Sequence, residues 1–422
     1  MTNVMKSNSG RVWTQTEITK IALRTLIFAT LLALGPAQAF AIAFRIPNQD
    51  AEAIARGNAF VATANNPSAI YYNPAGITQL EGHNVQVGVL NYLGINTYFE
   101  AQAGGDIDTE SEIVPLPQLY YVYSPQDSAF SFGLGVYAPF GLGVEWPDDS
   151  AMRPFAIESR LEYLTFNPVA AWKPHQTFSI AIGPTVNYSK LKLTRGLLSP
   201  TSDFFKFEGD NVSFGFNAGL LWQPHEKWSF GAQYRSASVT DFQGDSSYRL
   251  STLNSKVSTD LRVPFPQIVT AGVSFRPTPK WNLEVNVDYT DWHPLDRIRL
   301  DGTSDLAGGG LFPDLQLMLN FKGSWFYEFG VTRYFDNGWF AAAGYFYCSE
   351  TAPDDFFTPA VPDTELHVGS IGFGRKGERW NWAVSGQIIA GPERTISNSP
   401  NSPDGSYQLF IPTVSLSVGY RF

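Results

Sequence analysis

The segment Trp281-Asn282-Leu283-Glu284-Val285-Asn286-Val287-Asp288-Tyr289 alternates between apolar and polar side chains along its whole length. Successive side chains of a β-strand point to opposite sides, so one face of this segment is apolar and the other carries Asn, Glu and Asp. A soluble sheet buries the apolar face, whereas a membrane barrel turns that face outward to lipid and lines its interior with the polar one. The pattern therefore predicts a strand and leaves open which kind of sheet contains it.

The connections between such segments distinguish the two kinds of sheet. We expect about fourteen strands, close to residues 83–99, 114–124, 128–138, 160–173, 177–195, 210–223, 227–240, 259–276, 280–292, 323–335, 338–350, 364–376, 379–391 and 408–422. Every second connection is tight, as at 124–127 and 336–338, and the alternate connections are long, as at 139–159 and 293–322. Transmembrane barrels have short periplasmic turns and long extracellular loops. The sequence therefore predicts an all-β protein, a transmembrane antiparallel β-barrel with both termini in the periplasm.

The aromatic residues support this placement. Tryptophans flank the predicted short turns, at Trp172, Trp222, Trp228, Trp281, Trp339 and Trp380. Tryptophan is enriched where a membrane meets water, so we expect an aromatic girdle at the periplasmic interface. The last strand, 414–422, ends on Phe422 and is similar to the C-terminal signal of bacterial outer-membrane proteins, which the barrel-assembly machinery reads. We therefore expect a location in the outer membrane of a Gram-negative bacterium.

The composition argues against several other classes of protein. Aromatic residues make up 15% and charged residues 16% of the chain, and the formal net charge is -10. This negative charge and the lack of a basic stripe argue against nucleic-acid binding. No long apolar run occurs beyond the N-terminal region, so we expect no membrane-spanning helix in the mature chain. The single Cys348 cannot form an intramolecular disulfide, and the five histidines lack metal-ligand spacing. We therefore expect no metal, no cofactor and no catalytic residues.

The N-terminal region has the features of a secretory signal. Basic residues precede an apolar core at 25–34, and small residues suit cleavage after Ala39 or Ala41. We assign residues 1–41 to the signal peptide, 42–82 to a plug in the lumen, and 83–422 to the barrel.

The plug itself differs from the strand-like segments that follow. The alanine spacing over 48–64 predicts one or two short helices. Two prolines at 65–76 predict turns, and Gly76 is expected to adopt a left-handed conformation.

A tripeptide within the plug carries a family resemblance. Asn73, Pro74 and Ala75 follow the signal-like region and shortly precede the first predicted strand. In this position they resemble the N-terminal hatch of the FadL family, whose members are outer-membrane transporters for long-chain fatty acids and other hydrophobic molecules. The resemblance covers most of the mature chain. It implies a plugged barrel in which Asn73, Pro74 and Ala75 gate the path.

Glycine and proline interrupt the third predicted strand. Gly133, Gly135, Pro139 and Gly141 weaken a β-ladder and favour a kink or bulge. The segment resembles the kinked third strand of FadL, which leaves an opening in the barrel wall, and Gly141 best matches the glycine at the kink. The resemblance implies a lateral opening at these four residues. The alternative from the residues alone is an ordinary strand end that leads into an extracellular loop.

Segment 188–196 is similar to a family segment in which an arginine binds the fatty-acid carboxylate in the lumen. Arg195 matches that arginine, and Lys192 is the preceding lysine of the same pattern. A guanidinium makes bidentate bonds to a carboxylate, and these bonds are strongest where water is scarce. The alternative is a solvated luminal charge paired with Asp or Glu.

Two further residues, Phe155 and Lys322, complete the expected ligand site. Phe155 offers apolar surface at the extracellular mouth, and Lys322 follows Phe321 as in the family. The family places a second cation four residues before that Phe-Lys pair, but this chain has Leu317 there. The missing cation favours a less polar substrate than a fatty acid.

These features predict facilitated diffusion of hydrophobic molecules, long-chain fatty acids or hydrocarbons, through the outer membrane, with lateral exit through the wall. The other expected partners are outer-membrane lipid, lipopolysaccharide and the barrel-assembly machinery, and we expect a monomer that is not an enzyme. Three alternatives remain. A general porin would need an open lumen, a structural or adhesion barrel would not need the kinked strand, and a lipid hydrolase would show activity after solubilisation.

Overall fold

In the computed structural model, the described residues are 43–94, 96–102, 104–111, 113–197, 202–250, 253–305 and 314–422. The predicted signal peptide, residues 1–41, lies outside them. All of these described residues belong to one compact unit. No helix among the described residues is long and apolar enough to cross a membrane.

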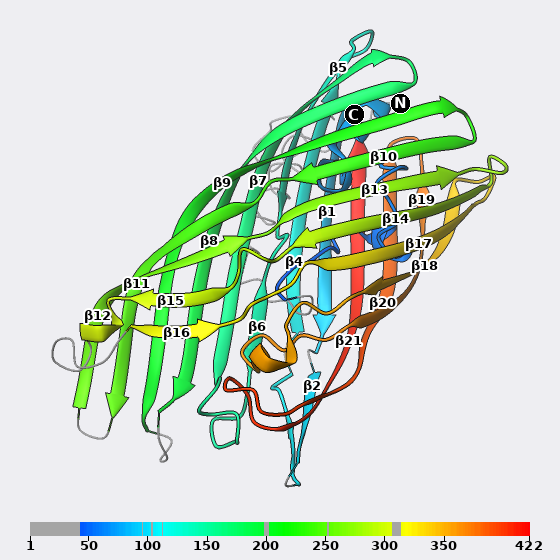
Figure 1. Ribbon diagram of the computed structural model, residues 1–422. Coiled ribbons are helices and arrows are strands. Elements are labelled where there is room, and N and C mark those ends of the chain that lie inside the picture. Colours follow the sequence, from blue (N-terminus) through cyan, green and yellow to red (C-terminus); the bar gives the residue numbers. More distant parts are fainter. Residues whose placement is uncertain are drawn as a thin grey trace, which may run out of the picture. The chain divides into compact units, whose positions relative to one another are not determined.

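Fourteen antiparallel strands of the described chain close into a barrel (Figure 1). They are β1 (Gly82–Leu93), β4 (Ile113–Ser124), β5 (Phe130–Tyr137), β7 (Glu158–His175), β8 (Phe178–Gly196), β9 (Phe204–His225), β10 (Trp228–Arg235), β13 (Gln267–Phe275), β14 (Trp281–Asp291), β17 (Ser324–Tyr334), β18 (Trp339–Cys348), β19 (Leu366–Lys376), β20 (Trp380–Ile396) and β21 (Gly405–Arg421). The barrel closes where β1 pairs with β4 on one side and with β21 on the other. The predicted all-β fold is confirmed.

The direction in which the strand faces point shows whether this is a soluble sheet or a membrane barrel. On β14 the polar side chains are buried, with Asn282, Glu284, Asn286 and Asp288 at most 1% exposed. The apolar side chains between them, such as Val285, are about two-fifths exposed on the outer wall. All six tryptophans beside the short turns are likewise exposed. The barrel therefore presents its apolar face outward, as a bilayer requires.

Several strands lie in regions that we expected to be loops. They are β2 (Asn96–Ala101), β3 (Asp106–Asp108), β6 (Leu142–Glu145), β11 (Ser238–Leu250), β12 (Leu253–Phe265), β15 (Arg297–Asp301) and β16 (Leu315–Met318), with 3-10 turns η2 (Thr303–Asp305) and η3 (Asp354–Phe356). Strand β11 pairs with both β9 and β12, and β15 pairs with β12 and β16. The long connections expected at 241–258 and 293–322 are therefore partly strands, since β11 pairs with β12 and β15 pairs with β16, which extends the sheet on the extracellular side.

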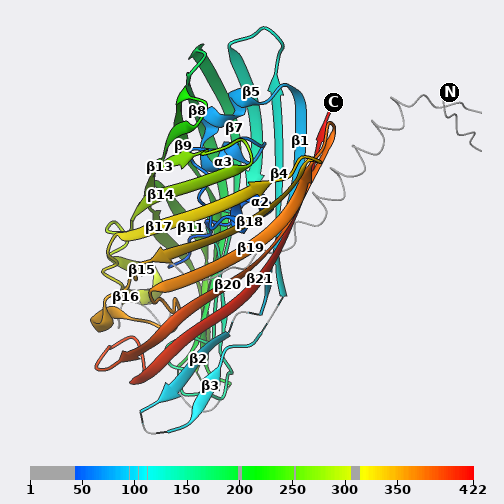
Figure 2. The same ribbon diagram turned by 90° about the vertical axis from the view of Figure 1, so that its right-hand side faces the viewer.

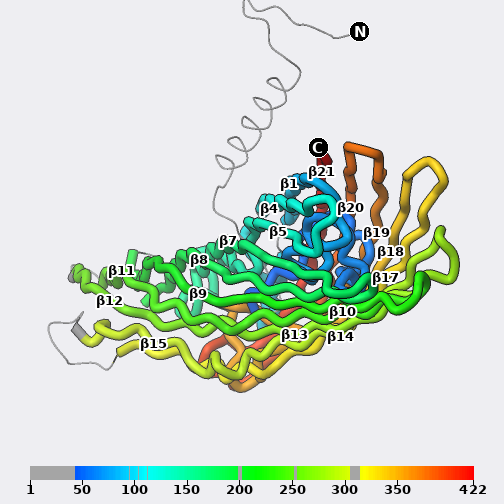
Figure 3. The backbone as a smooth tube through the Cα atoms, turned by 90° about the horizontal axis from the view of Figure 1, so that it is seen from above, coloured from blue at the N-terminus to red at the C-terminus, as the bar shows by residue number. Residues whose placement is uncertain are grey.

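The plug comprises helix α2 (Ala51–Ala55), helix α3 (Ala69–Tyr72) and 3-10 helix η1 (Pro74–Gln79). Figures 2 and 3 show it enclosed by the strands. The Asp50 side chain accepts a hydrogen bond from the Ala53 N–H and so caps α2. Within 48–64 only α2 forms, because Gly57 and Asn58 adopt left-handed conformations that end the helical path.

Two of our expectations for the second half of the plug are wrong. Residues 65–76 include α3 and the start of η1, and they are not turns alone. Gly76 is also absent from the residues with positive φ. A side-chain carbon at Gly76 would collide with Ala64, so this position requires glycine for close approach.

Glycines on the inner wall create the space in which the plug lies. A side-chain carbon at Gly231 would collide with the carbonyl of Val61, and one at Gly344 would collide with the backbone of Gly57. These glycines therefore allow plug and wall backbones to come into direct contact.

Candidate functional site

The hydrogen-bonded ladder of the barrel is interrupted between β4 and β5. Strand β4 pairs with β5 from Tyr123 to Leu119, and its pairing with β1 continues on to Ile113. No described residue of β5 or β6 is registered with the stretch from Ile113 to Gln118. We call this unpaired stretch of β4, together with Ala138–Gly141 opposite it, the seam.

The sequence of β4 keeps its edge at the seam unpaired. The β1–β4 ladder runs without interruption through Pro115 and Pro117. Proline has no backbone N–H to donate. Because the ladder with β1 is unbroken at both prolines, the side of the backbone on which each would carry its N–H must face away from β1 and toward the seam. A strand with two missing donors on one edge cannot form a regular ladder there.

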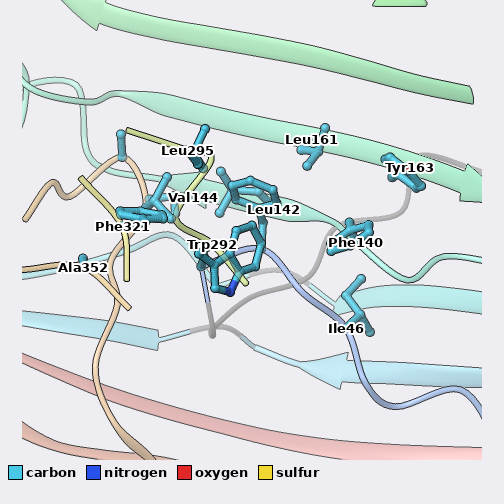
Figure 4. Packing of buried hydrophobic residues seen from close by; sticks show 14 of the residues in the cluster. Ile46, Phe140, Leu142, Val144, Leu161, Tyr163, Trp292, Leu295, Phe321 and Ala352 are labelled. Carbon is cyan, nitrogen blue, oxygen red and sulfur yellow. The ribbon is translucent and has the colours of Figure 1, made fainter. Parts of the chain in front are cut away.

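The other side of the seam is a bulge. From Tyr137 to Leu142 the chain takes five steps, while the partner strand β7 takes four, from Thr165 to Leu161. The extra residue turns Phe140 inward, where its side chain is 3% exposed. In Figure 4 Phe140 lies among buried apolar side chains that include Tyr163 and Trp292.

The start of the plug pairs with this bulge. The N–H of Ile46 donates to the carbonyl of Pro139 at 2.8 Å, and the N–H of Gly141 donates to the carbonyl of Phe44 at 2.8 Å. The backbone groups released by the bulge are therefore satisfied by the plug, as a low-dielectric wall requires. The segment Phe44–Ile46 is therefore bonded to the bulge side of the seam.

A buried ion pair fixes the position of this plug segment. Both terminal nitrogens of Arg45 donate to Asp288 on β14, at 2.6 and 2.8 Å, and one also donates to the Thr290 hydroxyl. The guanidinium lies 4.5 Å from the ring centre of Phe326. Arg45 and Asp288 are both almost completely buried, so neither can lose its partner without leaving a charge in the wall.

A second set of contacts holds the remainder of the plug. Glu284 on β14 accepts hydrogen bonds from the Ala62 N–H at 2.8 Å and from the Thr63 hydroxyl. Lys376 on β19 forms an ion pair with Glu52 of α2 at 2.7 Å. These contacts fasten the plug to β14 and β19, and the Gln86 amide of β1 also donates to Asp50 at 2.6 Å.

Asn73, Pro74 and Ala75 are buried against β9. The Asn73 amide donates to the carbonyl of Val61 at 2.8 Å and to that of Leu220 at 2.9 Å, so it joins two plug segments to the wall. Gly219 leaves the space that the Pro74 ring occupies. Gating by this tripeptide stays a prediction.

An apolar cavity of about 120 Å³ lies at the extracellular end of the lumen. Its lining includes Phe155, Leu193, Arg195, Phe205, Leu315 and Leu317. The structure thus brings Arg195, Phe155 and Leu317 together from distant parts of the sequence. A space of this size holds a small apolar molecule or one end of a longer one.

Arg195 is the cationic residue of this cavity. It is half-buried on the inward face of β8, and its guanidinium lies 5.9 Å from the ring centre of Phe205. Among the described residues, no acidic side chain forms an ion pair with it. The expected alternative, pairing with Asp or Glu, is therefore not observed within that part of the chain.

The two predicted lysines lie elsewhere. Lys192 is on the outer wall, because even-numbered residues of β8 face outward, and it pairs with Glu158 at 2.5 Å. Lys322 is exposed in the connection before β17, and neither lysine lines the cavity. Their assignment as ligand-binding residues stays a prediction, which the position of this cavity does not support.

The four residues of the expected lateral opening also divide into two groups. Gly133 and Gly135 belong to the regular part of β5, and a side-chain carbon at either would press on Ile70 of the plug. Pro139 and Gly141 lie in the bulge at the seam. The two glycines of β5 thus make room for the plug side chain. The break in the β-ladder begins only after Tyr137.

Sequence reasoning did not identify Asp363. This buried carboxylate accepts hydrogen bonds from the N–H groups of Thr351 and Ala352, at 2.6 and 2.8 Å, and from that of Ala43 at 3.2 Å. Burial raises the pKa of Asp363, and the three N–H groups oppose that rise. It joins an extracellular loop to the start of the plug, and nothing in the local sequence identifies this role.

The sequence matches the family model described as outer membrane protein transport protein (OMPP1/FadL/TodX) over residues 32–384. The chain belongs to this family. The long-chain fatty acid transport protein of Escherichia coli O6:H1 is 23% identical over 83% of this chain and 86% of its own length. These relationships place the protein in the Gram-negative outer membrane.

Solved structures of this family have the same fold. A FadL homologue of Pseudomonas aeruginosa superposes with a TM-score of 0.77 at 17% identity, over 90% of this chain and 99% of the other. The toluene transporter TodX of Pseudomonas putida gives 0.70 at 15% identity, over 92% of this chain and 100% of the other. The Escherichia coli and Pseudomonas putida proteins are described as transporters, which is consistent with a protein that is not an enzyme.

Proposed function

We propose that this FadL-family protein carries hydrophobic molecules, fatty acids or hydrocarbons, across the outer membrane by facilitated diffusion. Relatives described as fatty-acid and toluene transporters support this class of substrate. A ligand would bind first in the extracellular cavity beside Arg195 and Phe155. The plug that fills the lumen argues against a general porin, since a porin needs an open channel.

The observation that carries the proposal is the unpaired seam in an otherwise closed ladder. A hydrophobic molecule released into the periplasm must enter water, which costs about 25 cal/mol per Å² of exposed apolar surface. Release into the bilayer avoids this cost, and it requires an opening in the wall. The seam supplies that opening once Phe44–Ile46 moves away from Pro139 and Gly141.

A reversible crosslink across the seam tests the exit. The pair Pro117→Cys and Ala138→Cys continues the register of Leu119 with Val136 and is introduced together with Cys348→Ala. We expect oxidation, or a short bifunctional thiol reagent, to abolish uptake of a labelled fatty acid while binding remains. A reductant should restore uptake after a disulfide has formed.

The matched control joins the same two strands where they are already paired, through Tyr121→Cys and Leu134→Cys. This crosslink should leave uptake unchanged. Heat-modifiable migration verifies that each barrel is folded, and mass spectrometry gives the crosslinked fraction. Continued uptake by fully crosslinked seam barrels would show that the ligand leaves by another route, through the plug.

A further inference from the structure

The outer wall changes from apolar to charged over one short step along β7, β8 and β9. Tyr188 and Val212 are registered neighbours and are 41% and 44% exposed on the lipid-facing side. The next outward pair toward the extracellular side is Lys190 with Asp210, followed by Lys192 with Glu208. This step marks the height at which outer-leaflet head groups begin.

Four cations lie directly above that boundary on three adjacent strands. They are Arg160 on β7, Lys190 and Lys192 on β8, and Lys206 on β9. We call them the cation band. Their outward direction follows from strand alternation, because the residues between them face the lumen.

Carboxylates share this band with the cations and position them. The carboxylates that face outward at the same height are Glu158, Glu162, Glu208 and Asp210. Glu208 pairs with Lys190 at 2.9 Å and with Lys206 at 2.7 Å, and Glu158 pairs with Lys192 at 2.5 Å. Partly exposed pairs of this kind contribute little to stability. Folding therefore gives little reason for gathering them at one height on one side of the barrel.

The band borders a hollow on the same outer face. It measures about 460 Å³ and is lined by Lys190, Lys206, Asp210, Asp245 and Lys256, among others, from β8, β9, β11 and β12. The strands that the sequence did not predict, β11 and β12, form its far side. The hollow is polar and lies beside the lipid-facing surface, so it suits the charged head group of a molecule whose apolar part lies in the membrane.

We propose that the cation band and this hollow bind lipopolysaccharide through the phosphates of its lipid A. Phosphate oxygens accept charge-assisted hydrogen bonds from Lys and Arg. The neighbouring carboxylates accept hydrogen bonds from sugar hydroxyls, and they coordinate the divalent cations that accompany such phosphates. The acyl chains would lie on the apolar wall below Tyr188. This inference rests on the outer-membrane location and is independent of the transported substrate.

The test compares lipopolysaccharide binding by two charge-matched variants. The first carries Lys190→Gln, Lys192→Gln and Lys206→Gln. The control carries Lys173→Gln, Lys227→Gln and Lys280→Gln near the periplasmic turns. Each barrel in a phospholipid nanodisc is titrated with fluorescent lipopolysaccharide, and native mass spectrometry counts co-purified molecules.

We expect roughly a ten- to hundredfold weaker affinity for the first variant, since each cation near a charged lipid surface contributes on the order of 1 kcal/mol. The control and a variant with arginine at the same three band positions should bind normally. Wild-type protein should bind dephosphorylated lipopolysaccharide as weakly as the first variant binds the intact form.

Three results would overturn the proposal. One is binding within twofold of wild type by the band variant, and another is equal binding of dephosphorylated lipopolysaccharide. The third is an equal affinity for phosphatidylglycerol, which would indicate general attraction of anionic lipid. If the triple variant does not migrate as a folded barrel, Lys192→Gln alone replaces it and must still weaken binding several-fold.

Discussion

Two arginines inside the barrel differ in whether an acidic side chain forms an ion pair with them. Arg45 lies in the plug, donates to both oxygens of Asp288, and is almost completely buried. Arg195 lines the extracellular cavity, is half-buried, and has no acidic partner among the described residues. A matched buried pair favours one fixed structure, whereas an unmatched cation beside apolar surface remains available for an anionic ligand. We infer that the first fastens the plug and that the second selects the substrate.

The largest expected effect comes from breaking the matched pair. Asp288→Ala leaves the Arg45 guanidinium buried without its carboxylate and should lower the free energy of unfolding by about 3–5 kcal/mol. Arg195→Met removes a charge without leaving another unpaired, and should cost less than about 1 kcal/mol. Denaturant titration of the purified barrels, followed by tryptophan fluorescence and gel migration, measures both values.

A double variant sharpens this test. Arg45→Met with Asp288→Leu replaces both charges by apolar groups and should recover most of the loss, because no uncompensated charge remains. Equal destabilisation by Asp288→Ala and Arg195→Met would contradict the difference between the two arginines.

The next effect concerns the unmatched cation. Arg195→Ala should weaken binding of a fatty acid by about 1.5–3 kcal/mol, the range for a hydrogen bond to a charged group. Binding of a hydrocarbon of the same chain length should change little. Calorimetry or native mass spectrometry with the two ligands measures the difference. Equal losses for both would mean that Arg195 acts through the shape of the cavity.

The two arginines also show what the sequence can predict. Strand alternation, turn lengths and tryptophan positions predicted the barrel, because these signals are local and follow the pleat. The inward direction of Arg195 follows from the same period. Lys192 was assigned to the ligand site from a family pattern. The strand period, by contrast, puts its side chain on the outer wall.

Long-range contacts account for what was missed. The role of Arg45 depends on Asp288, more than two hundred residues away in the chain, and the role of Asp363 depends on Ala43. The strands β15 and β16 are only five and four residues long, so their alternation is too brief to stand out, and they form by pairing with each other. Pro115 and Pro117 were visible in the sequence, but their effect required knowing which edge of β4 has no neighbour.

A smaller effect should follow from giving the cavity a second cation. Leu317 lies in the β15–β16 hairpin and lines the cavity with Arg195. Leu317→Lys should strengthen carboxylate binding by about 0.2–1 kcal/mol, as for partly exposed ion pairs, and weaken hydrocarbon binding. Leu317→Met is the control of similar volume, and competition between the two ligands gives the ratio. If the lysine variant leaves that ratio unchanged, position 317 does not determine selectivity.

An effect of similar size is expected in the gate itself. Pro74 packs against Gly219 beside the Asn73 amide, and proline restricts the unfolded and open forms of this turn. Pro74→Ala should favour plug opening by about 0.4–1 kcal/mol, which corresponds to a two- to fivefold rise in uptake of a hydrophobic substrate. Uptake is measured in cells that lack other transporters of the substrate, at equal levels of folded barrel. Pro277→Ala, in a periplasmic turn, is the matched control. If Pro74→Ala and Pro277→Ala give the same uptake as wild type, the Asn73-Pro74-Ala75 turn is a fixed support of the plug and the moving part is Phe44–Ile46 alone.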